Sequence, residues 1–252
     1  TSLAESGFDP LSRSCRFMLT EEAHHMFVGE SGVGRVVERS AQLSAEHDTL
    51  EIGRHGGIPL AMIQKWINFH FSICLDLFGQ EKSTNAANFY SMGLKGRYNE
   101  NKIEDDHLLN NDGFLVPDLQ NGKVIMSEIS ALTAINERLR NDYRDDCQKG
   151  VDRWNRIIEK ANVDFKLTLP HIAFNRNIGT FQDSNFDLEG NLISAEEFAA
   201  NKDTWMPNSK DREFVKSLMQ RVVEPGKIAG WIAPPSRGIQ GKDIEYEYVI
   251  LH

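Results

Sequence analysis

Cysteine is scarce in this sequence of 252 residues: there are three, Cys15, Cys74 and Cys147, odd in number and far apart. Cysteines in this pattern argue against a disulfide framework and fit a reducing compartment. They also form no CxxC pair and no Cys/His spacing of the kind that binds zinc. We therefore expect free thiols and a cytoplasmic location.

The sequence also lacks a membrane span and a secretion signal. A transmembrane helix needs about 20 consecutive apolar residues, whereas the most apolar stretch, residues 58–79, is interrupted by Gln64, Lys65, Asn68, His70 and Asp76. It predicts a buried helix of a soluble protein, with no membrane partner. The opening "TSLAESGFDP" has no signal-peptide pattern. Because the chain starts with Thr1 and not with methionine, we interpret it as lacking its natural beginning.

Basic residues are fewer than acidic residues in this sequence. Lys and Arg number 28 against 37 Asp and Glu, which gives a net charge of −9, and the basic residues are scattered. Nucleic acid is therefore not expected as a partner. No GxSxG motif of a serine hydrolase occurs. Hydrophobic residues make up 40% of the chain, an ordinary globular value that is enough for a sizeable core.

Helical periodicity dominates the first two thirds of the chain. Apolar spacing predicts helices over residues 12–28, 34–48, 60–79, 85–95 and 127–161. Ser12 would cap the first helix, Gly29 and Gly32 would end it, and Gly150 would kink the last one. The polar residues between the last two helices, 96–126, predict mostly loop.

After about Val163 the pattern changes to short strands. The segments "FKLTLP", "FDLEGNLI" and "IEYEYVIL" predict strands, with one helix over residues 208–223 between them. The expected fold is mainly α: residues 1–162 form a helical region, part of a bundle, and residues 163–252 form a smaller C-terminal cap of mixed helix and short strands.

Several motifs have simpler interpretations than a functional site. "SGVGR" (31–35) fits no phosphate-loop spacing, so we interpret it as a turn between helices. "NFDLEGNLISAE" (185–196) resembles an EF-hand loop but starts with Asn185 and follows Pro170, which favours a Glu-Gly-Asn hairpin turn. The acidic run "NDYRDDCQ" predicts an exposed helix face, and Asp76 a polar anchor at a helix end.

Three Glu-x-x-His pairs stand out: Glu21/His24, Glu22/His25 and Glu104/His107. On a helix, residues three apart lie about 60° apart around the axis, so both side chains can reach one metal ion. The spacing alone is a weak signal. Glu104 and His107 lie in a polar acidic stretch, which favours a solvated surface.

The surroundings favour Glu22 and His25. They share an arc of the helical wheel with small residues, Cys15 and Gly29, that leave room for an ion or a substrate. The arc of Glu21 and His24 carries bulkier residues: Phe17, Thr20, Phe27 and Val28. A hydrogen-bonded Glu/His pair in the core is the alternative interpretation, with about equal weight.

The stretch "FMLTEEAHHMFVGESG" closely resembles the oxygenase components of benzoyl-CoA epoxidases, a ferritin-like di-iron family. The resemblance continues through "SLAESGFDPL", "RNDYRDDCQKGVDRWN", "IAFNRNIG" and "IEYEYV", and so covers essentially all of the chain. It implies a four-helix bundle around two iron ions, with Glu22 and His25 as iron ligands on the fourth helix. Glu21 and His24 would orient a ligand or pack beside it.

The resemblance also implies an incomplete site. Two of about six protein ligands are present, and the others would precede Thr1, in the N-terminal half of the same protein. The implied reaction is epoxidation of the ring of benzoyl-CoA at its 2,3 bond with O2, in aerobic benzoate degradation. Electrons would come from NADPH through a separate flavin and iron–sulfur reductase.

Two further expectations concern the substrate and the isolated segment. Lys95, Arg97, Arg144 and Arg153 are candidate cations for the CoA phosphates, although each is more often an ordinary surface residue. The segment by itself is expected to be inactive. Two alternatives stay open: a non-catalytic helical packing module that binds no metal alone, and a related acyl-CoA ring hydroxylase or epoxidase.

Overall fold

A computed structural model describes residues 2–94, 113–219, 221–238 and 241–249 of the protein. It confirms a mainly α-helical chain with a smaller mixed region. The α-helices are α1 (Asp9–His47), α2 (Leu60–Asp76), α3 (Ala86–Ser91), α5 (Ile135–Lys160), α6 (Ala195–Trp205) and α7 (Ser209–Leu218), and the short 3-10 helices are η1 (Ser2–Glu5) and η2 (Ile52–His55). None of the helices among the described residues combines the length and apolar character that crossing a membrane requires.

The described residues also form three small two-stranded sheets. They are the antiparallel pairs β1 (Gly113–Gln120) with β2 (Lys123–Ser130) and β3 (Asn185–Phe186) with β4 (Leu192–Ile193), and the parallel pair β5 (Lys227–Ala229) with β6 (Glu247–Val249).

The chain divides into two compact units, each assembled from separated stretches. Unit 1 comprises Thr1–Val28, Ser72–Asp145 and His171–Ala195, and unit 2 comprises Gly29–Phe71, Asp146–Pro170 and Glu196–His252. The boundary expected near residue 163, between a helical region (1–162) and a C-terminal cap (163–252), stays a prediction.

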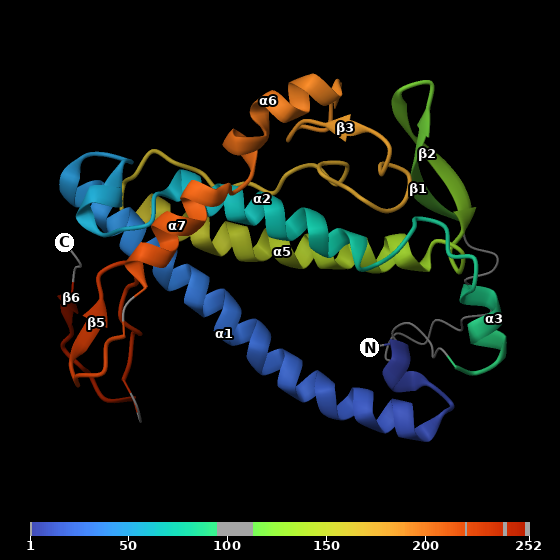
Figure 1. Ribbon diagram of the computed structural model, residues 1–252. Coiled ribbons are helices and arrows are strands. Elements are labelled where there is room, and N and C mark those ends of the chain that lie inside the picture. Colours follow the sequence, from blue (N-terminus) through green and yellow to red (C-terminus); the bar gives the residue numbers. More distant parts are fainter. Residues whose placement is uncertain (1, 95–112, 220, 239–240, 250–252) are drawn as a thin grey trace. The chain divides into compact units, whose positions relative to one another are not determined.

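Helix α1 is a single helix, so the predicted break at Gly29 and Gly32 is wrong, as is the turn at residues 31–35 (Figure 1). Glycine inside a helix costs only about 1 kcal/mol, and packing of the following turns outweighs this cost. Gly34 lies close to α5, since a Cβ there would be at van der Waals contact, 3.5 Å, from Nε1 of Trp154. Ser12 is not the cap either, since α1 begins at Asp9 and the Ser12 hydroxyl donates to the Ala4 carbonyl.

The predicted loop over residues 96–126 is wrong in its described part, where β1 and β2 form a hairpin with Asn121 and Gly122 at its tip. Both tip residues have positive φ, 51° and 74°, as a two-residue type I′ turn requires. The Asn-Gly pair was the available signal. Residues 127–134, predicted as helix, belong to β2 and a turn, and α5 begins only at Ile135.

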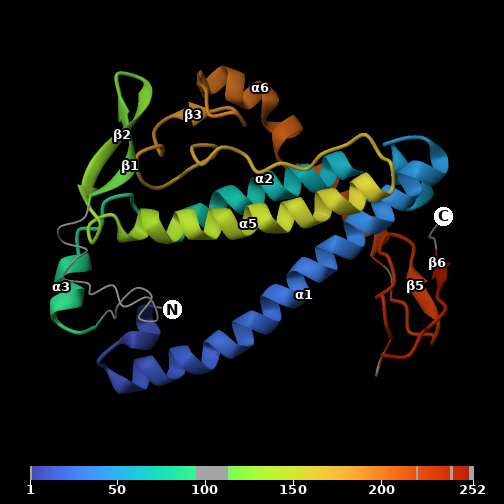
Figure 2. The ribbon, with the colours of Figure 1, turned by 180° about the vertical axis from the view of Figure 1, so that it is seen from behind.

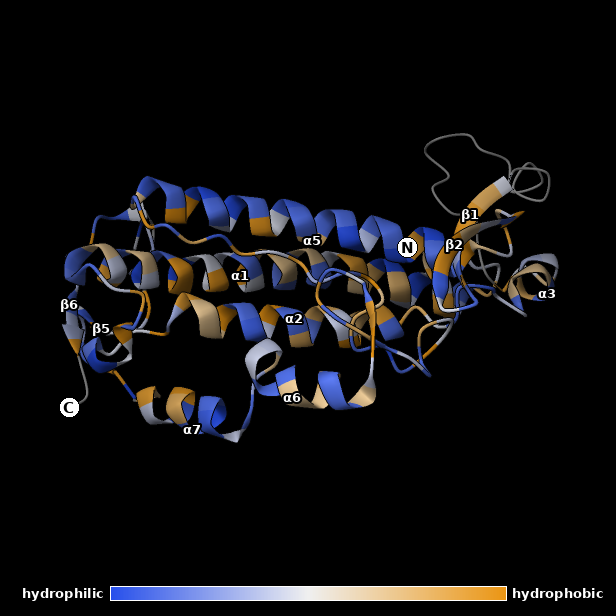
Figure 3. Cartoon of the chain, turned by 90° about the horizontal axis from the view of Figure 1, so that it is seen from above, coloured by the Kyte–Doolittle hydropathy of each residue, from blue (hydrophilic) through white to orange (hydrophobic). Residues whose placement is uncertain are grey.

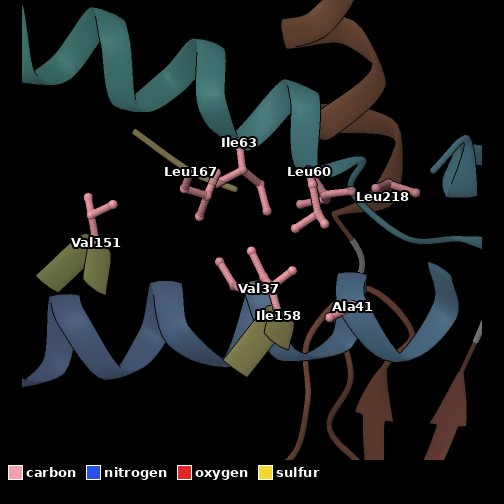
Figure 4. Packing of buried hydrophobic residues seen from close by; sticks show 9 residues of the cluster. Val37, Ala41, Leu60, Ile63, Val151, Ile158, Leu167 and Leu218 are labelled. Carbon is pink, nitrogen blue, oxygen red and sulfur yellow. The ribbon is translucent and has the colours of Figure 1, made fainter. Parts of the chain in front are cut away.

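The core of unit 2 lies between three helices. Helix α1 contributes Val37 and Ala41, α2 contributes Leu60 and Ile63, and α5 contributes Val151 and Ile158; Ile58, Leu167 and Leu218 complete the cluster (Figure 4). These residues recur at spacings of three, four or seven, which places them on one face of each helix. Figure 3 shows the same pattern on α5, where hydrophobic residues recur along a largely hydrophilic helix.

The segment "FKLTLP" is not a strand, contrary to the prediction. Its backbone hydrogen bonds go to amide side chains instead of to another strand. Asn155 donates to the Leu167 carbonyl (2.9 Å) and accepts from the Leu167 amide (2.8 Å). Gln64 binds Thr168 in the same two ways, at 2.8 Å each. Two helices thus satisfy the polar groups of an extended segment that covers the core.

The Glu-Gly-Asn hairpin turn is confirmed between β3 and β4, where the Asp187 carboxylate accepts from the amides of Glu189 (3.0 Å) and Asn191 (2.7 Å). Strand β6 is confirmed within "IEYEYVIL". The helix predicted over residues 208–223 is α7 and ends at Leu218. Helix α6 and strand β5 were not predicted; α6 has no buried residue, so it carries no clear apolar face.

Unit 1 contains a buried network of charged side chains at the end of α2 and the start of α5. Arg140 pairs with Glu137 and with Glu81 (3.2 Å), and it donates to the carbonyls of Leu75 and Gly79. Arg176 pairs with Asp76 at 2.6 Å, which confirms Asp76 as a polar anchor. Side-chain exposure is at most 3% for the two arginines and two glutamates and 11% for Asp76. The network ties three chain segments together.

Removal of Arg140 should destabilise this unit strongly. Arg140→Met would leave Glu137 buried without its guanidinium partner and Glu81 with only the longer contact to Arg176 at 3.8 Å, at a cost of about 3–5 kcal/mol. Chemical denaturation followed by circular dichroism measures the loss. The control is Arg13→Ala, which removes an ion pair with Asp9 that is 80% and 72% exposed and should cost less than about 1 kcal/mol. Equal losses in the two variants would contradict this assignment.

Glu137 should make stability depend on pH. Burial raises the pKa of Glu137 above its usual 4.5, against the opposing effect of Arg140. A carboxyl with a raised pKa in the folded state contributes its stability fully below the unfolded pKa and loses it as pH rises through the folded pKa. The advantage of the native chain over Glu137→Gln should therefore shrink as pH rises above 4.5. Parallel stability curves from urea unfolding at pH 5 to 8 would contradict the prediction.

Candidate metal-binding helix

Helix α1 presents the Glu-His motif within its first half, in unit 1. The Glu22 carboxylate (Oε1) lies 3.6 Å from Nδ1 of His25, so the two side chains lie on the same face of the helix. The helical spacing predicted this arrangement. The His24 and His25 ring centroids are 6.4 Å apart. Glu21 and His24 occupy the neighbouring positions of the same turns.

The motif is exposed among the described residues. The Glu22 and His25 side chains are 57% and 63% exposed, and every residue from 16 to 29 is exposed. Six of these residues are large and apolar, and we call them the apolar belt: Phe17, Met18, Leu19, Met26, Phe27 and Val28. A helix that is apolar around its circumference is typical of a buried position.

Small residues flank the pair, as predicted. A Cβ added at Gly29 would meet nothing within 4 Å, and Cys15 is a free, half-buried thiol. Open space is therefore present at Gly29, on the C-terminal side of Glu22 and His25.

Glu22 and His25 fit a partial iron site. Carboxylate and imidazole are ligands that ferrous iron accepts while other positions stay open. In the described ranges, however, no group of three or more His, Cys, Asp or Glu side chains is placed to hold a metal. The pair therefore offers two ligands of a site that needs more.

The structure describes only some of the other candidate site residues. Lys95, Arg97, Glu104 and His107 lie outside the described residues. Arg144 forms two hydrogen bonds with the Asp145 carboxylate, at 2.9 and 3.1 Å.

Arg153, on α5, binds the carboxylate of Glu30 with two of its nitrogens. Its guanidinium group is thus part of an ion pair with a residue of α1. This contact joins positions 123 apart in sequence, and no local motif could have revealed it.

Sequence reasoning also missed a pair of stacked histidines. His47, in the last turn of α1, and His55, in η2, have ring centroids 3.6 Å apart and nearly parallel planes. Burial and the neighbouring His47 lower the pKa of His55. Parallel rings in face-to-face contact do not converge their in-plane nitrogens on one metal ion.

Fold and motif define a mainly α-helical protein with a Glu-x-x-His turn on a long helix. Comparison with known proteins identifies a specific relative. The chain is 50% identical over 251 residues to "Benzoyl-CoA oxygenase component B" from Aromatoleum evansii, a match that covers 98% of this chain and 53% of the relative. This confirms the resemblance to a benzoyl-CoA oxygenase component. The chain spans about half the length of the curated relative that it matches. No family model matches the chain.

This chain alone should bind ferrous iron weakly. Two exposed ligands supply only part of a coordination sphere, so water would occupy the remaining positions. Anaerobic Fe(II) titration of the 252-residue chain, with competition against a chelator, measures the affinity. Tight, stoichiometric binding by this chain would show that further ligands lie within it.

Proposed function

We propose that this chain is part of a di-iron oxygenase component that epoxidises the ring of benzoyl-CoA at its 2,3 bond. The observation that carries the proposal is the Glu22–His25 pair, on one face of α1 with open space at Gly29 beside it. The pair occurs in a chain that is half identical to a benzoyl-CoA oxygenase component.

Glu22 and His25 would hold iron, with the remaining ligands supplied by residues outside this chain. When bound, the two irons supply the capacity to activate O2 and to use two electrons. The positive charge of the metal would compensate the Glu22 carboxylate once the helix is covered. Glu21 and His24 would orient the ligands through hydrogen bonds.

The apolar belt would form the wall of the reaction site. Met18, Leu19 and Met26 lie near the Glu22–His25 arc, according to their positions on the helical wheel. Apolar side chains there would exclude water and accommodate the aromatic ring.

The proposed reaction is a two-electron monooxygenation of the ring. One oxygen atom of O2 adds across the 2,3 carbon–carbon bond of the ring and forms the epoxide, while the other atom takes two protons and leaves as water. The two electrons come from NADPH through a separate reductase with flavin and iron–sulfur groups. The name "component B" of the relative supports a multicomponent system. We place the reaction in the cytoplasm.

We further propose that the apolar belt is covered by additional bundle helices of the same protein. About half of the relative's length has no counterpart in this chain, which is ample for the three further helices of a four-helix bundle. Such helices would bury the belt and bring the missing ligands to Glu22 and His25.

Two alternatives differ in what they predict. A non-catalytic packing module would use the belt only for contacts and would hold no iron. A related ring hydroxylase or epoxidase would share the iron site but act on another acyl-CoA thioester.

Loss of either ligand should remove iron. In the full-length protein that carries this sequence, Glu22→Ala and His25→Ala should each lose most of the iron, measured by metal analysis of the purified protein. Glu46→Ala, an exposed substitution on the same helix, serves as the control and should retain the iron. Full iron content in both ligand variants would refute the proposed site.

Substrate profiling separates the remaining alternative. We expect O2 consumption and an epoxide product with benzoyl-CoA, and little turnover with phenylacetyl-CoA, whose extra methylene displaces the ring from the site. Preference for phenylacetyl-CoA, measured by the ratio of kcat/KM values, would assign the chain to the related class.

A further inference from the structure

Helix α5 binds α1 at Glu30 through two consecutive residues. Arg153 binds both oxygens of the Glu30 carboxylate, with its second nitrogen 2.6 Å from Oε2. Trp154 donates from Nε1 to the Glu30 carbonyl at 3.3 Å. The side chain and the backbone of one residue are therefore both held, and all three residues belong to unit 2. We call this group the Glu30 clamp.

Gly34 lies beside the clamp. It lies one turn after Glu30 on α1, and a Cβ there would lie 3.5–3.6 Å from atoms of the Trp154 indole, at van der Waals contact. Helix α1 therefore runs close to the indole at this turn. Trp154 also packs against the buried core of unit 2, so the indole that contacts Glu30 is itself fixed.

The exposure of the ion pair argues against a purely stabilising role. The Arg153 and Glu30 side chains are 44% and 40% exposed, and exposed ion pairs add little to stability. The two-pronged geometry, in contrast, restricts orientation strongly, because guanidinium and carboxylate planes must align. The two-pronged contact therefore favours one rotation of α1 at Glu30.

The clamp lies close to the motif along the helix. Glu30 follows His25 by five residues, where the fully exposed run of α1 ends. A helix is a hydrogen-bonded rod in which each residue advances by about 100°, so rotation fixed at one turn is passed to the turns beside it. The direction in which Glu22 and His25 project thus depends on how Glu30 is held.

We infer that Arg153, Glu30 and Trp154 are positioning residues that set the rotation of α1 and thereby aim Glu22 and His25 at their metal. The inference rests on the proposed function. It assigns to α5 a role in metal binding without any direct contact with the metal.

The test uses the full-length protein in its iron-free form. Arg153→Lys keeps the charge but loses the two-pronged geometry, and Glu30→Gln keeps the shape but loses the charge. Each should weaken Fe(II) binding about tenfold, as loss of ligand-orienting residues does elsewhere. Hydrogen exchange of residues 16–30, measured by mass spectrometry without iron, should become faster in both variants.

Two controls keep the test specific. Arg13→Ala removes an exposed ion pair between two residues of α1, Arg13 and Asp9, and it should leave both readouts unchanged. The reversed pair Glu30→Arg with Arg153→Glu restores opposite charges and should recover most of the affinity. A further variant, Trp154→Phe, keeps an aromatic ring but removes the N–H donor, and it should have a smaller effect in the same direction.

The outcomes are distinguishable. Fe(II) affinity of Arg153→Lys and Glu30→Gln within twofold of Arg13→Ala would overturn the inference, and so would a reversed pair as weak as the single variants. If Glu22→Ala retains its iron, the proposed function fails and the clamp role fails with it. If Glu22→Ala loses its iron while the Arg153 and Glu30 variants bind normally, only the clamp role is refuted.

Discussion

Polar side chains of α5 hold the main chain of neighbouring segments through hydrogen bonds. In unit 1, Arg140 binds the carbonyls of Leu75 and Gly79 at the end of α2. In unit 2, Asn155 binds both polar groups of Leu167, and Trp154 binds the carbonyl of Glu30. For Leu167, which lies outside any helix or strand, these bonds take the place of a strand partner. For Leu75, whose carbonyl also accepts from the Phe78 amide, they add a second partner. The arrangement explains why a helix with so many polar residues is central to both units.

The sequence predicted those features that depend on neighbouring residues. The apolar run of α2, the turn between β3 and β4 and the shared face of Glu22 and His25 all follow from local spacing or turn chemistry. The continuity of α1 did not, because the turns that follow Gly29 and Gly32 are held by core contacts of Val37 and Ala41 with residues far along the chain.

The candidate site was predictable only in its composition. Motif and resemblance selected Glu22 and His25, but they could not show that both would lie exposed among the described residues. The Glu30 clamp could not be predicted from the sequence, since an ion pair between distant positions leaves no periodic pattern. The hairpin of β1 and β2, by contrast, could have been predicted, because an Asn-Gly pair is a recognised signal for a two-residue hairpin turn. The polar composition of the surrounding residues obscured this signal.

That hairpin has a consequence for handling the protein. Strand β2 pairs only with β1 among the described residues, so its outer edge leaves main-chain donors and acceptors unmatched. Val124, Ile125 and Met126 on this strand are exposed. An unpaired strand edge with exposed hydrophobic side chains can pair with strands of other molecules. Concentrated samples should therefore aggregate through β2 first, and a lysine at position 125 would act as a gatekeeper.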